Sequence, residues 1–333
     1  MSGFDSVIAQ PGAVRTLRLA VERGRVASAY LFEGPSGVGK QKAALALAQA
    51  MVCETAPGKG CGACATCRRA AEGKHPDVRT FGPRDEGNRN IQVDFLRNEI
   101  LPFAQYAPFE ARAALLIFPE ADVSFPEAHP ESANALLKTL EEPRKNVHFV
   151  LLAERPDRLL PTIRSRCQTV RFNRLPPQVV DRILADHRVG ERERDAAVAL
   201  SDGRADRALT LAESGTGERV LGHALHIDRC VESARPGALV ALAEDLARSD
   251  DLPLALDTLA TFYRDVAAAA LGAGDDALTF RHQADAVRER AQTLSPARAA
   301  ARVELLRETV DTFEWNANKQ VALDGLFYRL GAV

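Results

Sequence analysis

A glycine-rich run that ends in lysine is the clearest chemical feature of this sequence. Residues 34–40 read Gly-Pro-Ser-Gly-Val-Gly-Lys, after a short apolar run (30–32) and before an amphipathic run (43–51). A strand, a glycine-rich loop and a helix in this order cradle phosphate, because backbone N–H groups of the loop and first helical turn point at the anion. The ammonium group of Lys40 supplies a cation. We therefore expect a nucleotide to bind at Gly34, Gly37, Val38, Gly39, Lys40 and Gln41.

The residue after the lysine departs from the phosphate-loop pattern. Phosphate-loop enzymes carry Ser or Thr there, because its hydroxyl ligates the Mg²⁺ ion that bridges the phosphates. This chain has Gln41 at that position. A glutamine amide is bulkier than a hydroxyl and fits poorly into the near-octahedral shell that Mg²⁺ demands. The cradle is therefore expected to lack a metal ligand.

A second departure follows the apolar run 113–118. A phosphate-loop ATPase carries Asp-Glu after such a strand, where the Asp holds Mg²⁺ and the Glu polarises the attacking water. Here the two residues are Pro119 and Glu120. Proline has no side-chain oxygen, so the second metal ligand is missing. Glu120 keeps the water-polarising position, but it cannot replace the ligand, because strand alternation would point it to the other face of the strand. We expect ATP or ADP to bind without hydrolysis and Mg²⁺ not to be held.

Four cysteines within fifteen residues form the second chemical feature. Cys53, Cys61, Cys64 and Cys67 are spaced C-x7-C-x2-C-x2-C, in a stretch with few apolar residues. In a reducing compartment such a cluster indicates a metal site and not disulfide bonds. Four thiolates suit tetrahedral Zn²⁺ and leave no open position, so the site would be structural. An iron–sulfur cluster and four unliganded thiols are the alternatives, and His75 is expected at the surface, outside the ligand set.

Composition limits the class of protein. A chain of 333 residues allows two or three domains, and 46% hydrophobic with 26% charged residues is a globular balance. A net charge of −2 argues against a strongly basic nucleic-acid binder, so DNA contacts would be local or made through partners. The sequence shows neither a signal-peptide pattern nor an apolar run of membrane-spanning length. We expect a cytoplasmic protein with no membrane contact.

Strand and helix patterns alternate as far as Phe172. Helical spacing is found at 11–26, 43–53, 91–105 and 129–143. Apolar strand patterns occupy 30–32, 77–81, 113–118, 147–153 and 168–172. Such alternation predicts an α/β fold with a mostly parallel sheet and helices on both faces.

After Phe172 only helical patterns remain. Three short ones lie within 176–213. From about residue 216 the chain is rich in Ala, Leu, Arg and Glu, and three prolines divide it into an expected five or so helices: Pro236, Pro253 and Pro296.

The order of these features resembles the AAA+ clamp-loader subunits of bacterial DNA polymerase III, over essentially the whole chain. The closest matches are SANALLKTLEEP at 132–143 and TIRSRCQTVRF at 162–172. The resemblance implies a AAA+ phosphate-loop domain with a small zinc module, then a three-helix lid, then an all-helical collar domain that oligomerises. The corresponding ranges are 1–173 with the zinc module at 53–67, 174–214, and 215–333.

The family contains motor subunits (gamma/tau) and a near-inactive partner type, delta-prime. Gln41 and Pro119 stand where a motor subunit has its Mg²⁺ ligands. The sensor position after the strand at 147–152 falls on Ala153 or Glu154, and Asp206 replaces the phosphate-sensing arginine of the lid. These four departures make the chain similar to the delta-prime type. By itself the chain is then expected not to be an active ATPase. It is expected to be a component of a DNA-directed DNA polymerase holoenzyme.

The resemblance also gives a role to Arg166, in the Ser-Arg-Cys motif at 165–167. An arginine supplied in trans neutralises the charge that develops on a neighbouring subunit's phosphoryl group. The competing interpretation is that Arg164 and Arg166 end a strand or pair with acidic neighbours.

Three functions therefore stay open. The first is a non-motor subunit that lends Arg166 to a neighbour and helps place the sliding clamp on primed DNA. Its implied partners are the gamma/tau and delta subunits, and its implied place is the nucleoid-associated replisome. The second is an ATP-hydrolysing subunit of the gamma/tau type, or an unrelated phosphate-loop enzyme that hydrolyses ATP itself, favoured by Lys40 and Glu120. The third is a zinc-stapled scaffold that uses the glycine-rich loop for packing alone.

Overall fold

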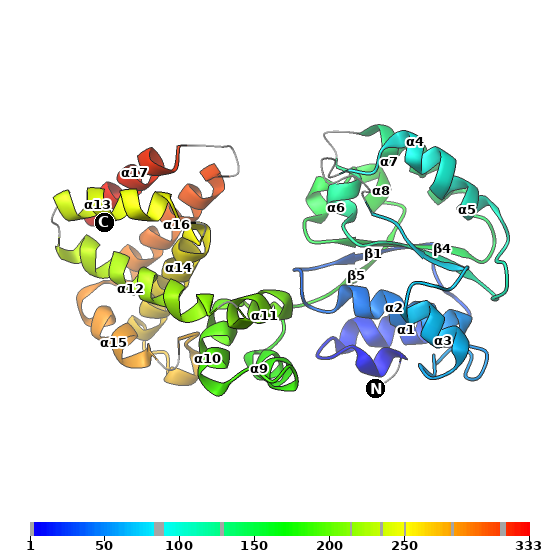
Figure 1. Cartoon of the computed structure of the whole chain (residues 1–333), viewed down its shortest axis with the longest axis horizontal. Coiled ribbons are helices and arrows are strands. Elements are labelled where there is room, and N and C mark those ends of the chain that lie inside the picture. The colour runs from blue at the N-terminus through cyan, green and yellow to red at the C-terminus, as the bar shows by residue number, and fades with distance from the viewer. Residues whose placement is uncertain are drawn as a thin grey trace. The chain divides into compact units, whose positions relative to one another are not determined.

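The computed structural model of the chain divides into two units, Met1–Val179 and Val180–Val333 (Figure 1). The residues described are 3–82, 90–126, 130–213, 215–233, 236–249, 251–280, 283–313 and 318–333. Each unit is described by itself. The division into three domains expected from the sequence stays a prediction.

The first unit is organised around a five-stranded parallel sheet with the order β2-β3-β4-β1-β5. Its strands are β1 Ala29–Glu33, β2 Val78–Thr80, β3 Ala114–Phe118, β4 Val147–Ala153 and β5 Gln168–Arg171. Every residue of β3 is buried, as expected of a parallel strand covered on both faces, because such strands read as continuous apolar runs. The predicted parallel sheet is thus confirmed.

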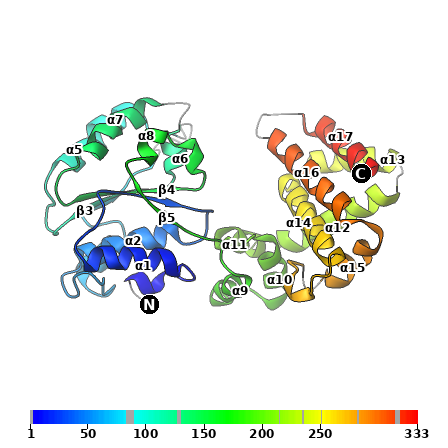
Figure 2. The ribbon, with the colours of Figure 1, turned by 180° about the vertical axis from the view of Figure 1, so that it is seen from behind.

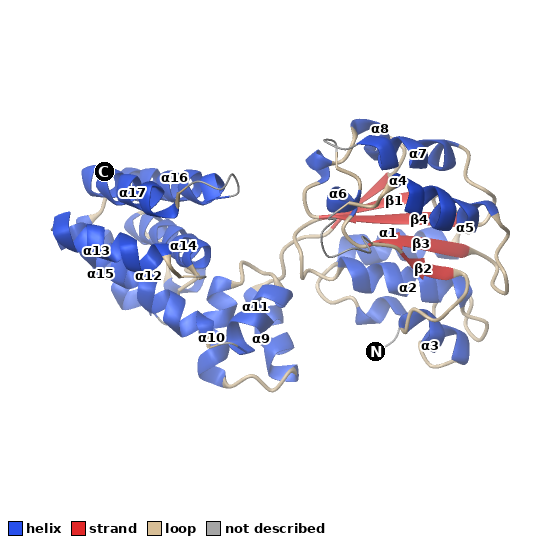
Figure 3. Cartoon of the chain, turned by 45° about the horizontal axis from the view of Figure 1, so that its top comes forward, coloured by secondary structure: helices blue, strands red, loops and turns tan. Residues whose placement is uncertain are grey.

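Helices cover both faces of this sheet, as predicted (Figures 2 and 3). One layer contains α1 Pro11–Glu22, α2 Lys40–Val52 and α3 Ala65–Ala71. The other contains α4 Val93–Phe95, α5 Leu101–Gln105, α6 Ala121–Ser124, α7 Pro130–Glu141 and α8 Pro161–Arg164. The helix expected over 91–105 is interrupted, because Leu96–Ile100 between α4 and α5 forms a π-helical segment.

The core beneath the second layer is continuous. Leu116 and Phe118 of β3 and Phe149 of β4 are fully buried. They belong to the same cluster as Leu136 and Leu140 of α7, so the apolar stripe of that helix packs on the sheet. The positions of α7 and of the segment after β4 are therefore set by shared core packing.

The second unit is helical. The three short helices expected after the sheet are present as α9 Pro177–Asp186, α10 Glu191–Leu200 and α11 Ala205–Glu213. The rest comprises α12 Thr216–Ser233, α13 Pro236–Ala247, α14 Leu252–Ala270, α15 Ala284–Thr293, α16 Pro296–Phe313 and α17 Lys319–Ala332.

The expected number of helices after residue 216 is too low. The described residues form six α-helices there. The three prolines do mark helix starts, since Pro236 and Pro296 open α13 and α16 and Pro253 lies in the first turn of α14. Gly272 (φ +91°) supplies a further break after α14 that proline punctuation does not reveal. Within the described ranges no helix is both long and apolar enough to cross a membrane.

Candidate functional site

The glycine-rich loop connects β1 to α2 at the carboxyl end of the sheet. Gly34, Gly37 and Gly39 have φ of +149°, +66° and +101°, in the region that L side chains rarely adopt. A Cβ on Gly34 would lie 2.3 Å from the carbonyl oxygen of Phe172, so only glycine fits between the loop and the end of β5. The positive φ angles, and at Gly34 the close approach of Phe172, therefore explain the glycines of this loop.

Lys40 is the first residue of α2, and its side chain folds back over the loop. It is 9% exposed, and its Nζ donates hydrogen bonds to the carbonyl oxygens of Gly34 (2.5 Å) and Pro35 (2.6 Å). The N–H groups in the first turn of a helix have no acceptor within the helix. Lys40 and the start of α2 thus place a cation beside backbone donors, an arrangement that suits an anion.

Gln10 is a residue of this site that the sequence analysis missed. Its side chain is 2% exposed, and Nε2 donates to the carbonyl oxygens of Val38 (3.2 Å) and Asn173 (2.7 Å). Its Oε1 accepts the Asn173 N–H at 3.0 Å. Gln10 therefore ties the phosphate loop to the segment after β5. The only sequence signal is a polar residue directly before Pro11, the first residue of α1.

The positions expected to lack metal ligands lie near the carboxyl ends of the strands. Gln41 is exposed in the first turn of α2, and Pro119 and Glu120 directly follow β3, half-buried and exposed respectively. Ala153, at the sensor position, ends β4, and its carbonyl oxygen accepts the Gly34 N–H at 3.2 Å. Neither the Pro119 ring nor the Ala153 methyl group can ligate a metal.

Asp122 is the second residue of the site that the sequence analysis missed. Asp122 belongs to α6 and is 7% exposed. Its Oδ2 accepts a hydrogen bond from the backbone N–H of Arg155 at 2.8 Å. This bond joins the segment after β3 to the segment after β4. An acidic residue two positions past Glu120 is a sequence signal that could have found it.

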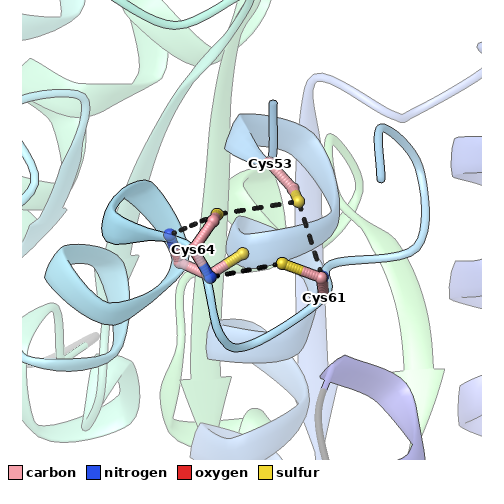
Figure 4. Close-up of side chains that lie close together, drawn as sticks. Cys53, Cys61 and Cys64 are labelled. Carbon is pink, nitrogen blue, oxygen red and sulfur yellow. Dashed lines mark hydrogen bonds between the residues drawn. The ribbon is translucent and has the colours of Figure 1, made fainter. Parts of the chain in front are cut away.

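The four clustered cysteines come together between α2 and α3. The four Sγ atoms all lie within 4.8 Å of one another, and Figure 4 shows Cys53, Cys61 and Cys64 pointing inward. Ligands 2.3 Å from a tetrahedral Zn²⁺ are about 3.8 Å apart, so small shifts would close the set. The donor set and its spacing therefore fit a metal with four thiolate ligands.

Backbone donors surround the sulfur atoms. The N–H groups of Ala56 and Cys61 lie 3.2 and 3.5 Å from Cys53 Sγ, and the N–H of Cys67 lies 3.4 Å from Cys64 Sγ. The Cys67 N–H lowers the pKa of the Cys64 thiol to about 6, whereas burial raises the pKa of Cys67. Metal binding would have to overcome the second effect, since each ligand must be deprotonated.

His75 is buried, contrary to the expected surface position. It is 1% exposed, its Nδ1 accepts the Asp77 N–H at 3.0 Å, and Nε2 lies 3.2 Å from Oε1 of Glu110. Glu110 also contacts Arg69 of α3 at 2.5 Å. His75 therefore belongs to the packing beside the cysteine module, where periodicity gives no sign of burial for an isolated histidine in a polar stretch.

Arg166 lies in the turn between α8 and β5, with 34% of its side chain exposed. Its Nη1 donates to the carbonyl oxygen of Thr162 at 2.9 Å, and its Nη2 contacts Oε1 of Glu141. In the second unit, Asp206 is exposed near the start of α11, with Oδ1 3.7 Å from Nε of Arg204. Arg166 is thus accessible and also paired within its own chain.

A parallel α/β sheet, a glycine-rich loop and a buried lysine at the start of α2 define a phosphate-loop type of protein. The family model described as "DNA polymerase III, delta subunit" matches residues 9–176, half of the chain. The chain belongs to this family, as the resemblance in its sequence indicates.

Two curated relatives illustrate the range of similarity. "DNA polymerase III subunit delta'" of Bacillus subtilis (strain 168) is 38% identical over 176 residues, which are 53% of this chain and 51% of the relative. "DNA polymerase III subunit gamma/tau" of Mycobacterium tuberculosis (strain ATCC 25618 / H37Rv) is 34% identical over 195 residues, 58% of this chain and 32% of the relative. The chain thus spans about half the length of the first relative and a third of the second.

A solved structure of a gamma subunit-related protein from Thermotoga maritima is also similar. It is 17% identical, with a TM-score of 0.44, and the match covers 96% of this chain and 98% of that chain.

Proposed function

We propose that this chain is a non-motor AAA+ subunit of the DNA polymerase III clamp loader, of the delta-prime type. It binds a nucleotide without hydrolysing it and lends Arg166 in trans to an ATP site of a neighbouring gamma/tau subunit. In this way it helps load the sliding clamp onto primed DNA. The observation that carries the proposal is a glycine-rich loop with Lys40 hydrogen-bonded to it, combined with Gln41 and Pro119 at the two positions where a motor subunit has Mg²⁺ ligands.

The loop geometry supports nucleotide binding. The phosphates would be surrounded by the buried Lys40 and by the backbone of Gly37, Val38 and Gly39. Gln10 fixes the loop through its hydrogen bond to the Val38 carbonyl oxygen. A bound nucleotide supplies the anionic phosphates for these donors. Because Gln41 and Pro119 offer no hydroxyl or carboxylate, the chain's own part in the reaction is to supply a charge to its neighbour.

Arg166 has the chemistry for that part. A guanidinium is always charged and presents a planar set of donors that matches a phosphoryl group, which lysine cannot copy. In GTPases such a residue is worth about 10³–10⁵ in rate. The accessible position of Arg166 after α8 supports the assignment.

The cysteine module is proposed to hold one structural Zn²⁺ through Cys53, Cys61, Cys64 and Cys67. The four sulfur atoms lie within 4.8 Å of one another, which supports the proposal. Four thiolates would fill a tetrahedral site and leave no position for a substrate. The module then serves the fold of the segment between α2 and α3.

The experiment is a clamp loader reconstituted from this chain and the gamma/tau and delta subunits of the same organism. Arg166→Ala is expected to reduce clamp loading and DNA-stimulated ATP turnover by about tenfold or more, because the affected site loses its finger. Arg171→Ala, which removes an arginine with 82% of its side chain exposed, is the control. Unchanged loading and turnover by the Arg166 variant would refute the finger assignment.

A second candidate function is ATP hydrolysis by a gamma/tau-type subunit. It is favoured by the similarity to gamma/tau sequences and by the retained Lys40 and Glu120. The purified chain would then turn over Mg-ATP alone, at a rate that Lys40→Ala abolishes. Under the delta-prime proposal both proteins leave Mg-ATP intact.

A further inference from the structure

The guanidinium of Arg166 is held at both of its terminal nitrogens. Nη1 donates to the carbonyl oxygen of Thr162 at 2.9 Å, one helical turn earlier, and Nη2 contacts Oε1 of Glu141 at the end of α7. Glu141 belongs to SANALLKTLEEP and Arg166 to TIRSRCQTVRF, so the contact joins the two stretches that carry the family resemblance. The sequence analysis gave Glu141 no role.

The backbone on each side of this contact is fixed by the core. Leu140, next to Glu141, is 3% exposed, and Ile163 of α8 is fully buried in the same cluster. Helices α7 and α8 are in contact. The backbone at Glu141 and the backbone near Arg166 are therefore held close together by buried neighbours, although the Glu141 side chain is 47% exposed.

The contacts to Thr162 and Glu141 leave N–H groups of the guanidinium available for a further acceptor. The guanidinium carries five N–H groups in a fixed fork, and the contacts to Thr162 and Glu141 use one on each terminal nitrogen. Nη1 also lies 3.5 Å from Oγ of Ser165, so the remaining N–H groups are on Nη2 and Nε. An arginine side chain has a large rotamer entropy, which it would otherwise lose when it engages a phosphoryl group. An anchor at each terminal nitrogen removes part of that loss in advance and sets the direction in which the fork points.

We propose that Glu141 is a positioning residue for Arg166, which holds the guanidinium in the orientation that a neighbouring phosphoryl group requires. This inference rests on the function proposed above for Arg166. Glu141 itself touches neither nucleotide nor phosphate, and its effect passes entirely through Arg166. The opposite role, a latch that keeps Arg166 away from the neighbour, predicts faster turnover when the carboxylate is removed.

The test is a double-mutant cycle in the reconstituted clamp loader. Glu141→Ala is expected to lower kcat for DNA-stimulated ATP turnover about tenfold with KM for ATP little changed, because a misplaced catalytic group mainly costs rate. Glu141→Gln keeps an acceptor oxygen and should lose less. In the Arg166→Ala background, Glu141→Ala should cause no further loss.

The control is Glu142→Ala, which removes the adjacent exposed carboxylate. Circular dichroism of each variant, and assembly of each into the complex, establish that folding is intact. An effect of Arg166→Ala with none of Glu141→Ala would overturn this inference and leave the proposed function standing. A rise in turnover, or an equal loss in both backgrounds, would also overturn it, whereas no effect of Arg166→Ala would remove the proposed function itself.

Discussion

Gln10 and Asn173 form a paired amide contact across 163 residues of sequence. The side chain of Gln10 both donates to the Asn173 carbonyl and accepts from its N–H, at 2.7 and 3.0 Å, and it also reaches Val38 in the phosphate loop. A single buried amide thus connects the start of the chain, the nucleotide cradle and the segment that leaves the sheet.

Gln10→Ala is expected to destabilise the first unit and to weaken nucleotide binding together. The substitution removes the donor to the Val38 carbonyl in a buried contact, and both partners that the backbone of the exposed Asn173 has on Gln10. The buried carbonyl left without a partner costs about 1–3 kcal/mol in the free energy of unfolding. Urea unfolding followed by circular dichroism measures the first effect, and titration with a fluorescent ATP analogue measures the second. Gln92→Ala, at an exposed glutamine, is the matched control. Unaltered stability would show that Gln10 does not hold the loop.

Restoring two metal ligands should make nucleotide binding depend on Mg²⁺. In the natural chain, the affinity for a fluorescent ATP analogue is expected to be similar with Mg²⁺ and with a chelator, because positions 41 and 119 offer no hydroxyl or carboxylate. In Gln41→Thr combined with Pro119→Asp, Mg²⁺ should raise the affinity by about tenfold or more, since both oxygens return. Each single substitution serves as a control.

Lys40→Ala should remove most of the binding in the same titration, because the loop loses its buried cation. Retained affinity in this variant would favour a scaffold that uses the loop for packing alone. Strong Mg²⁺ dependence in the natural chain would contradict the missing-ligand interpretation.

Elemental analysis is expected to find about one Zn²⁺ per chain, the stoichiometry of a Cys₄ site. Cys64→Ser or a strong chelator should release it and increase hydrogen exchange across 53–71, because the free energy of metal binding is folding free energy there. Amides of β4, in the centre of the sheet, provide the internal control. Iron with visible charge-transfer absorption would instead indicate a cluster.

Acid should destabilise the first unit through His75. Burial lowers the pKa of this histidine in the folded chain, and its Nδ1 already accepts the Asp77 N–H. The unfolded chain therefore takes up the proton first, so the free energy of unfolding should decrease as pH falls below about 6.5. Urea unfolding of the metal-loaded chain at about pH 7.5 and about pH 5.5 measures the change.

His75→Asn supplies the comparison, because its Oδ1 can accept the same N–H without titrating. Its pH dependence should be smaller than that of the natural chain. Some dependence should persist, since burial also lowers the pKa of His148 on β4. Identical slopes in the two proteins would exclude His75 as a source.

Periodicity and local motifs were sufficient for the α/β sheet, the phosphate loop and the cysteine cluster. Each depends on residues close in sequence: the buried run of β3, the loop before α2, and the four thiols within fifteen positions. The π-helical segment at Leu96–Ile100 was not predicted, because the apolar face of a helix persists through one wider turn. The break at Gly272 was not predicted, because the helices of this region were divided at prolines alone.

Only the tertiary structure decided which distant residues meet. Gln10 with Asn173, Asp122 with Arg155, His75 with Glu110, and Glu141 with Arg166 are pairs between different segments, joined because the sheet order and the shared core bring those segments together. A linear pattern records the spacing within a segment, whereas contacts between segments follow from how their apolar faces pack.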